Sequence, residues 1–107
     1  MKVSYLVAAS LAGFVVSGHG LAADATKAQA LMKGSDCMAC HAVETKLVGP
    51  SYKDVAKKYK GNGDAVAMLV KKVKAGGSGN WGAIPMTPHP NLKDEDVKTM
   101  VEWILSN

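Results

Sequence analysis

The pentapeptide Cys37-Met38-Ala39-Cys40-His41 constrains this chain more than any other feature, because it contains the only two cysteines of the sequence. Two cysteines separated by two residues and followed directly by a histidine form the attachment pattern of a c-type haem. The spacing suits the chemistry, since both thiols can add to the vinyl groups of one porphyrin and the histidine follows on the same side. The sequence therefore predicts one haem c, bound covalently through Cys37 and Cys40, with His41 as an iron ligand.

Two other uses of such a cysteine pair fit the sequence less well. A redox-active dithiol is expected within a pattern of alternating strands and helices, and this chain shows almost no strand signal. A structural zinc site usually takes four ligands, and no second pair of cysteines is present. Dithiol chemistry in a haem-free protein remains the main alternative, and a purified protein without haem would support it.

The first residues of the chain predict its cellular compartment. A positively charged start precedes a largely apolar run over residues 3–16, and small residues follow. This order is typical of a secretory signal peptide, and the apolar run is shorter than the roughly 20 residues that span a membrane. We expect residues 1–23 to be a signal peptide cleaved after Ala22 or Ala23, and residues 24–107 to be the mature domain in the periplasm. The alternative is an uncleaved anchor; after cleavage, no stable membrane insertion is expected.

Charge and size exclude further classes of function. The formal charge of +4 falls to +3 when Lys2 is removed with the signal peptide, and every basic residue is a lysine. A modest excess of lysine suits weak attraction to acidic protein surfaces rather than tight binding of phosphate. No clustered basic face with recognition residues points to nucleic acid. A chain this short is also small for a hydrophobic core of its own, and a covalently bound haem would add apolar surface.

Four amphipathic segments predict a mainly helical fold. We expect helices over residues 25–33, from an N-cap at Ser51 to Gly61, from a cap at Asp64 to the residue before Gly76, and over residues 94–105. Their inner faces consist of apolar residues at helical spacing: Ala28, Leu31 and Met32; Tyr52, Val55, Ala56 and Tyr59; Met68, Leu69 and Val73; and Val97, Met100, Val101, Ile104 and Leu105.

Residues 76–91 are different, because glycine and proline dominate them, and they predict a long irregular loop of the kind that usually serves function. Among the methionines of the mature chain, only Met86 lies outside both the attachment motif and the helical patterns. Pro85 and Pro88 restrict the backbone around it, and a methionine thioether is a common second ligand in electron-transfer haem proteins. We expect Met86 to ligate the iron opposite the motif histidine. His89 is the competing ligand, although we expect it to be a surface histidine.

In this order, the motifs resemble those of class I bacterial cytochromes c, in particular the small single-haem cytochrome c-551/c-552 subfamily. The resemblance runs from about Lys27 to the end of the chain. The segments that carry it are the pentapeptide, Val48-Gly49-Pro50, residues 52–59 and 77–82, Ile84-Pro85-Met86 and Trp103-Ile104-Leu105.

The resemblance implies an all-α, class I cytochrome c fold, with four to five helices around one covalently bound haem and crossed N- and C-terminal helices. It implies that His41 and Met86 are the two metal ligands, and that the carbonyl of Pro50 accepts a hydrogen bond from the ligand imidazole. Trp81 matches a tryptophan that hydrogen-bonds a haem propionate, and Lys72 falls where a basic side chain pairs with a propionate.

Three positions depart from the family pattern. Thr87 stands where proline is frequent, and His89 stands where an asparagine commonly supports the methionine sulfur. Asp36 stands where a small or neutral residue is usual.

An iron with both axial positions filled can exchange an electron but cannot bind a substrate, so we expect no catalytic residues and no enzyme. The resemblance implies a periplasmic electron carrier between a quinol-oxidising complex, such as cytochrome bc1, and a nitrite reductase or cytochrome oxidase. We expect a monomer. The resemblance implies that its redox partners dock at an apolar haem edge bordered by Lys33 and Lys46. The residues expected to form this edge are Met38, Ala39, Leu47, Val48, Ile84 and Thr87. A haem enzyme or gas sensor is the alternative, and it would need a vacant or displaceable sixth position.

Overall fold

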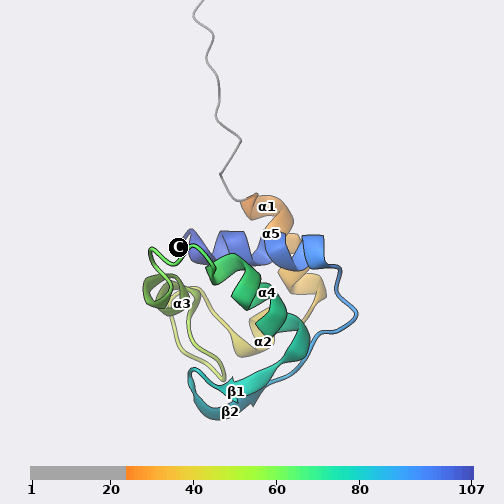
Figure 1. The fold of residues 1–107 in the computed structure, drawn as a ribbon. Coiled ribbons are helices and arrows are strands. Elements are labelled where there is room, and N and C mark those ends of the chain that lie inside the picture. The colour runs from red at the N-terminus through yellow and green to blue at the C-terminus, as the bar shows by residue number, and fades with distance from the viewer. Residues whose placement is uncertain (1–23) are drawn as a thin grey trace, which may run out of the picture.

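A computed structural model describes residues 24–107, and the signal peptide expected over residues 1–23 lies outside the described residues. The described chain contains five helices and one two-stranded hairpin (Figure 1). The helices are α1 (Ala25–Gly34), α2 (Cys37–Cys40), α3 (Tyr52–Lys58), α4 (Ala65–Ala75) and α5 (Asp94–Leu105). The strands β1 (Gly77–Gly79) and β2 (Gly82–Met86) pair antiparallel. Over residues 24–107, no helix combines the length and apolarity that a membrane crossing requires.

Helix α5 is the element on which the other long helices pack. It contacts α1, α3 and α4, and Figure 1 shows α1 passing across it. The expected contact between the N- and C-terminal helices is therefore confirmed. The main core cluster joins these helices through residues that are almost fully buried: Ala28, Met32, Tyr52, Val97, Met100, Val101 and Trp103. Leu31 and Ile104, which we expected on the same inner faces, pack against the edge of this cluster and are partly buried.

Capping residues determine where two of the helices begin. The Asp24 carboxylate accepts a hydrogen bond from the backbone N–H of Lys27 at 3.0 Å and caps α1. The Ser51 hydroxyl accepts one from the backbone N–H of Asp54 at 3.1 Å and caps α3, as its position predicted. These bonds satisfy donors that the first turn of a helix leaves free.

Three details of the expected helices are wrong. Asp64 occupies the N-cap position of α4, but its side chain makes no capping bond; instead, its backbone N–H donates to the side-chain oxygen of Asn62 at 2.9 Å. Helix α3 ends at Lys58 and continues to Gly61 only as turns. Met68, expected on the inner face of α4, is 45% exposed, whereas Leu69 and Val73 pack against the core as expected, together with Val66 and Val70.

The segment expected to be an irregular loop forms a hairpin over much of its length. Gly77 pairs with Met86 and Gly79 with Gly82, and the register shifts between the two pairs. Both glycines of β1 have a φ of 113°, a conformation that residues with side chains rarely adopt. Strand β1 has the sequence Gly-Ser-Gly and so carries no alternating apolar pattern, and for this reason its sequence did not predict a strand.

Asp36, immediately before α2, is the only described residue other than glycine with a positive φ, at 60°. The left-handed conformation costs a residue with a Cβ atom about 1–2 kcal/mol, less for Asp and Asn than for others. We expect Asp36→Gly to stabilise the holoprotein by about 0.5–1 kcal/mol in guanidinium unfolding. Asp36→Asn removes the charge but keeps the strained backbone, so it should leave stability nearly unchanged. A glycine variant less stable than the asparagine variant would contradict this account.

Candidate haem-binding site

The single turn of α2 brings both cysteines and the histidine of the pentapeptide to one place. Cys37 and Cys40 are three residues apart in a helix, so their side chains project from the same side. Both thiols are free; Cys40 is exposed and Cys37 is half-buried. Burial raises the pKa of the Cys37 thiol, and the nearby charges of Asp36 and Cys40 add to this effect. The chain leaves the helix at His41 in an extended conformation.

The imidazole of His41 is held by a hydrogen bond to Pro50. The distance from His41 Nδ1 to the Pro50 carbonyl oxygen is 2.8 Å. A carbonyl can only accept, so Nδ1 carries the proton, and Nε2 is left with its lone pair available to a metal. Bonds of this kind from a ligand histidine to a backbone carbonyl fix the ring and tune the metal. The structure therefore brings together His41 and Pro50, the pair that the family resemblance implied.

Gly49 lies so close to the same ring that no side chain fits at this position. A Cβ atom on Gly49 would lie 2.4 Å from Cε1 and 2.8 Å from Nδ1 of His41. The backbone of Gly49 also donates a hydrogen bond to the Cys40 carbonyl at 2.8 Å, which closes the loop onto the end of α2. Nothing in the sequence pattern indicated this contact between Gly49 and the histidine.

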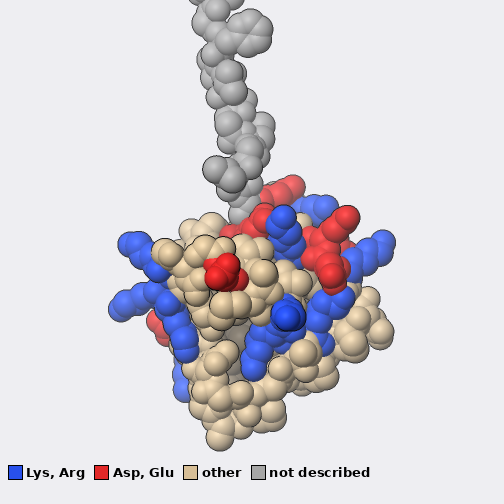
Figure 2. Space-filling view, in the orientation of Figure 1, with Lys and Arg blue, Asp and Glu red and all other residues tan. Residues whose placement is uncertain are grey.

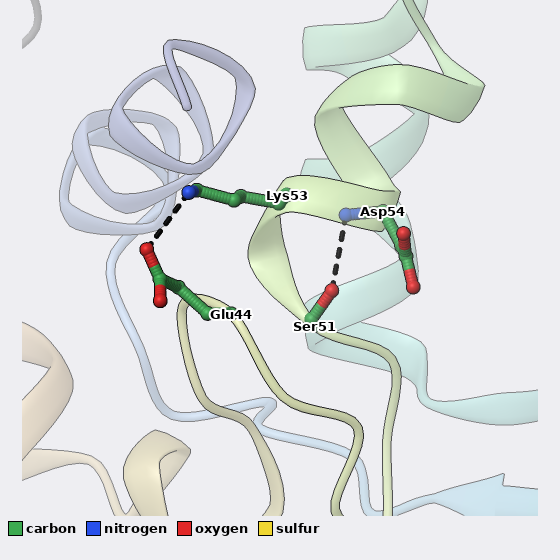
Figure 3. A network of polar contacts seen from close by, with 4 residues as sticks. All are labelled: Glu44, Ser51, Lys53 and Asp54. Carbon is green, nitrogen blue, oxygen red and sulfur yellow. Dashed lines mark hydrogen bonds and ion pairs between the residues drawn. The ribbon is translucent and has the colours of Figure 1, made fainter.

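Polar contacts fix the loop between the pentapeptide and α3. The backbone N–H groups of Tyr52 and Lys53 donate to the carbonyls of Ala42 and Val43 at 2.9 and 3.0 Å. Figure 3 shows the Lys53 side chain extending from α3 to Glu44, at 2.8 Å between Nζ and Oε1. This ion pair lowers the pKa of the Glu44 carboxyl. Because both side chains are exposed, the backbone bonds contribute most of the order of the loop.

Tyr52 supports the histidine from the protein interior. Its ring stacks on the His41 ring at 5.3 Å between centroids and 19° between planes, and it meets Trp103 edge-on at 5.8 Å. Tyr52 is only 2% exposed. Burial raises the pKa of its phenol, and the two cysteines add smaller contributions that thioether formation would remove. Sequence reasoning identified Tyr52 as a core residue but gave no sign of this stacking.

The raised pKa of Tyr52 predicts a specific loss of stability in alkali. Above pH 10 the unfolded chain releases the phenol proton while the folded chain retains it, so the free energy of unfolding falls as the pH rises. We expect wild type to lose about 1.4 kcal/mol per pH unit above pH 10 relative to Tyr52→Phe, the value for one proton. Guanidinium unfolding of both holoproteins between pH 9 and 11 measures this difference. If the free energies of unfolding of the two proteins changed in parallel with pH, the fold would not protect Tyr52 from ionisation.

The hairpin carries two of the other expected site residues. Met86 ends β2 and is half-buried, and Trp81 lies at the turn between the strands. Trp81 is 41% exposed. Lys58 Nζ lies 4.6 Å from the centroid of its indole ring. Lys72 lies at the other end of the hairpin, with Nζ 3.3 Å from the position that a Cβ atom of Gly77 would take.

His89 is not the surface histidine that we expected. It is partly buried, and Nδ1 of its ring is buried without a hydrogen-bond partner among the described residues. Its backbone N–H donates to the Val73 carbonyl at 3.0 Å, which ties the chain beyond the hairpin to α4.

The described chain leaves a large apolar surface uncovered around the cysteines and the hairpin. Six large apolar side chains are exposed: Met38, Leu47, Val48, Met68, Trp81 and Ile84. An open hollow of about 330 Å³ lies between Tyr59, α4 and the hairpin, where Met68 and Leu69 are joined by Lys71 and Lys72. Figure 2 shows lysine side chains beside it. Apolar walls with cations at the rim fit a porphyrin with its two carboxylates, so the residues present fit a haem.

Over residues 24–107, no three histidine, cysteine or acidic side chains lie together as a group that could hold a metal ion.

Figure 1 shows α2 and the hairpin at the same end of the molecule, away from the crossing of α1 and α5. The structure therefore gathers the elements that carry Cys37, Cys40, His41 and Met86 at one end.

Comparison with known proteins agrees with this arrangement. Residues 25–107 match the family model described as cytochrome c. The chain is 44% identical over 106 residues to cytochrome c-552 of Nitrosomonas europaea, and this alignment covers 99% of this chain and 98% of the relative. It is 51% identical over 92 residues to cytochrome c-552 of Hydrogenobacter thermophilus, with 86% and 93% covered. The crystal structure of wild-type Nitrosomonas europaea cytochrome c552 superposes with a TM-score of 0.70 and 50% identity, covering 73% of this chain and 96% of that chain.

The attachment motif, the helical fold and these matches lead to one conclusion. The chain belongs to the class I cytochromes c, in the cytochrome c-551/c-552 family of single-haem electron carriers that bind haem c covalently through two cysteines, here Cys37 and Cys40, and are not enzymes.

Proposed function

We propose that this cytochrome works in the periplasm, as a monomer, and carries single electrons from a membrane quinol-oxidising complex to a nitrite reductase or terminal oxidase. Residues 1–23 are its cleaved signal peptide, and residues 24–107 are the working domain. His41 and Met86 are the two iron ligands, and Pro50 orients the histidine. Trp81 and Lys72 bind the haem propionates.

The observation that carries the proposal is the hydrogen bond from His41 to the Pro50 carbonyl, at 2.8 Å. It leaves Nε2 as the metal-binding nitrogen of a ring that Tyr52 and Gly49 hold on its other sides. A ring fixed in this way needs little rearrangement when the charge of the metal changes. Bound haem supplies a reversible one-electron couple, and a methionine as the second ligand raises its potential.

The exposed apolar residues near the attachment motif support docking at the haem edge. Met38, Leu47, Val48 and Ile84 are 41%, 48%, 54% and 67% exposed. Exposed large apolar side chains that lie together mark an interaction surface. Redox partners that meet briefly bury little area, and charges at the rim of the patch steer the encounter. These exposed apolar side chains support a transient complex with a redox protein rather than a permanent one.

Three measurements on the exported protein test the proposal. Intact mass and N-terminal sequencing of periplasmic protein should give a chain that begins at Ala23 or Asp24 and carries one haem. Gel filtration should give a monomer. Reduced protein should pass electrons to a cytochrome cd-type nitrite reductase or a cytochrome oxidase, and Ile84→Ser should slow this transfer without altering the visible spectrum. A retained N-terminus would refute the cleavage, and transfer to neither acceptor would refute the proposed role.

A further inference from the structure

The hairpin is the least supported part of the described chain. Its strands pair with each other, but neither packs extensively against a helix. At its base, two backbone bonds tie the chain to α4: from Gly76 to the Lys72 carbonyl at 2.7 Å and from His89 to the Val73 carbonyl at 3.0 Å. Both bonds lie next to the ends of the strands, so neither holds the turn at Asn80 and Trp81.

One side chain holds that turn from across the molecule. Lys58, the last residue of α3, donates a hydrogen bond from Nζ to the backbone carbonyl of Asn80 at 2.8 Å. The same Nζ lies 4.6 Å from the centroid of the Trp81 ring and 5.9 Å from that of Tyr59. The Lys58 ammonium group therefore bonds to the backbone of the turn and also lies near two aromatic rings, that of Tyr59 next to it in the chain and that of Trp81 in the hairpin.

This combination differs from an ordinary solvated surface lysine. A hydrogen bond with a charged donor is stronger than one between neutral groups. Attraction between the cation and the face of an indole ring, the best of the aromatic rings for this purpose, adds to it. The two contacts join Lys58 to residues that are 22 and 23 positions further along the sequence, so they restrict the hairpin as a whole rather than a local turn.

We propose that Lys58 is a positioning residue that clasps the tip of the hairpin to α3 and thereby fixes Trp81 and, through β2, Met86. The clasp lies at the rim of the hollow between Tyr59, α4 and the hairpin. Its release lets the turn move outward and exposes this hollow, where the haem fits, to solvent. The effect on the iron rests on the proposed ligation by Met86, whereas the effect on the hairpin does not.

Amide hydrogen exchange in the reduced holoprotein tests the clasp directly. Lys58→Met keeps the length of the side chain but removes the donor and the charge, and we expect it to speed exchange of the amides of the paired strand residues Gly79 and Gly82 about tenfold. Lys58→Arg retains a cation that can donate and stack, so it should restore most of the protection. Lys57→Met, one residue earlier in α3, serves as the matched control and should leave the hairpin unchanged.

The visible spectrum provides a second measurement. A general loss of stability would not weaken the methionine band while leaving amide exchange in α1 and α5 unchanged. We expect Lys58→Met to weaken the far-red band of methionine ligation at neutral pH, while exchange in α1 and α5 stays at the wild-type rate. Hairpin exchange equal in the Lys58→Met and wild-type proteins would overturn the proposal, and so would an arginine variant as unprotected as the methionine variant. A wild-type protein without the far-red band would refute ligation by Met86, but the exchange data would still decide whether Lys58 clasps the hairpin.

Discussion

Replacing Met86 by alanine is expected to abolish the far-red absorption band of methionine ligation and to lower the reduction potential. The thioether sulfur stabilises the reduced metal, so its loss favours the oxidised form. We expect a fall of the order of 0.2 V, within the roughly 0.8 V range that axial ligands span. Visible spectroscopy and a redox titration of the purified holoprotein measure both effects.

Met68→Ala is the matched control, because Met68 is also partly exposed and lies in α4 at the hollow. It should retain the band and a potential close to that of wild type. His89→Ala should retain the band as well, since we assign the ligand role to Met86. An unaltered spectrum of the Met86→Ala protein, or loss of the band in the His89→Ala protein, would show that the assignment is wrong.

Replacing Gly49 by alanine is expected to be the most damaging change on the histidine side of the site. The new Cβ atom would lie 2.4 Å from Cε1 of His41, well inside van der Waals contact. The ring cannot move aside freely, because Pro50 holds one edge and Tyr52 packs on its face. Overpacking of this kind costs roughly 1–3 kcal/mol, and we expect a loss at the upper end of that range.

Gly63→Ala provides the control for the intrinsic effect of the substitution, because a Cβ atom there would meet nothing within 4 Å. Guanidinium unfolding of both holoproteins measures the difference in stability, and the potential reports any tilt of the imidazole. If the Gly49→Ala protein matched the Gly63→Ala protein in both, the contact with His41 would have no structural importance.

The helices were predictable because their sequences carry local signals. Helix α5 was expected over residues 94–105 and occupies those residues, since its apolar spacing and acidic first turn both agree with a helix. Ser51 was identified as a cap from its position alone, and the structure confirms its bond to Asp54. These features depend on residues within a few positions of one another, so one sequence is enough to reveal them.

Features that depend on distant parts of the chain were not predictable in this way. Glycines with positive φ in β1 carry no strand pattern, and the exposure of Met68 depends on how α4 turns toward α5. The bond from Lys58 to Asn80 joins two segments with no shared motif. On the site itself, the pentapeptide identified the haem attachment because covalent chemistry requires adjacent residues, whereas the contacts of Gly49 and Tyr52 with His41 follow only from the fold.

Exposure of the reduced native protein to carbon monoxide at neutral pH tests the central claim most directly. If the haem of this cytochrome is closed by His41 on one side and Met86 on the other, the Soret band should stay unchanged under saturating gas. Ready and stoichiometric binding, seen as a shifted Soret band, would mean that the sixth position is open and would contradict the assignment of this protein as an electron carrier.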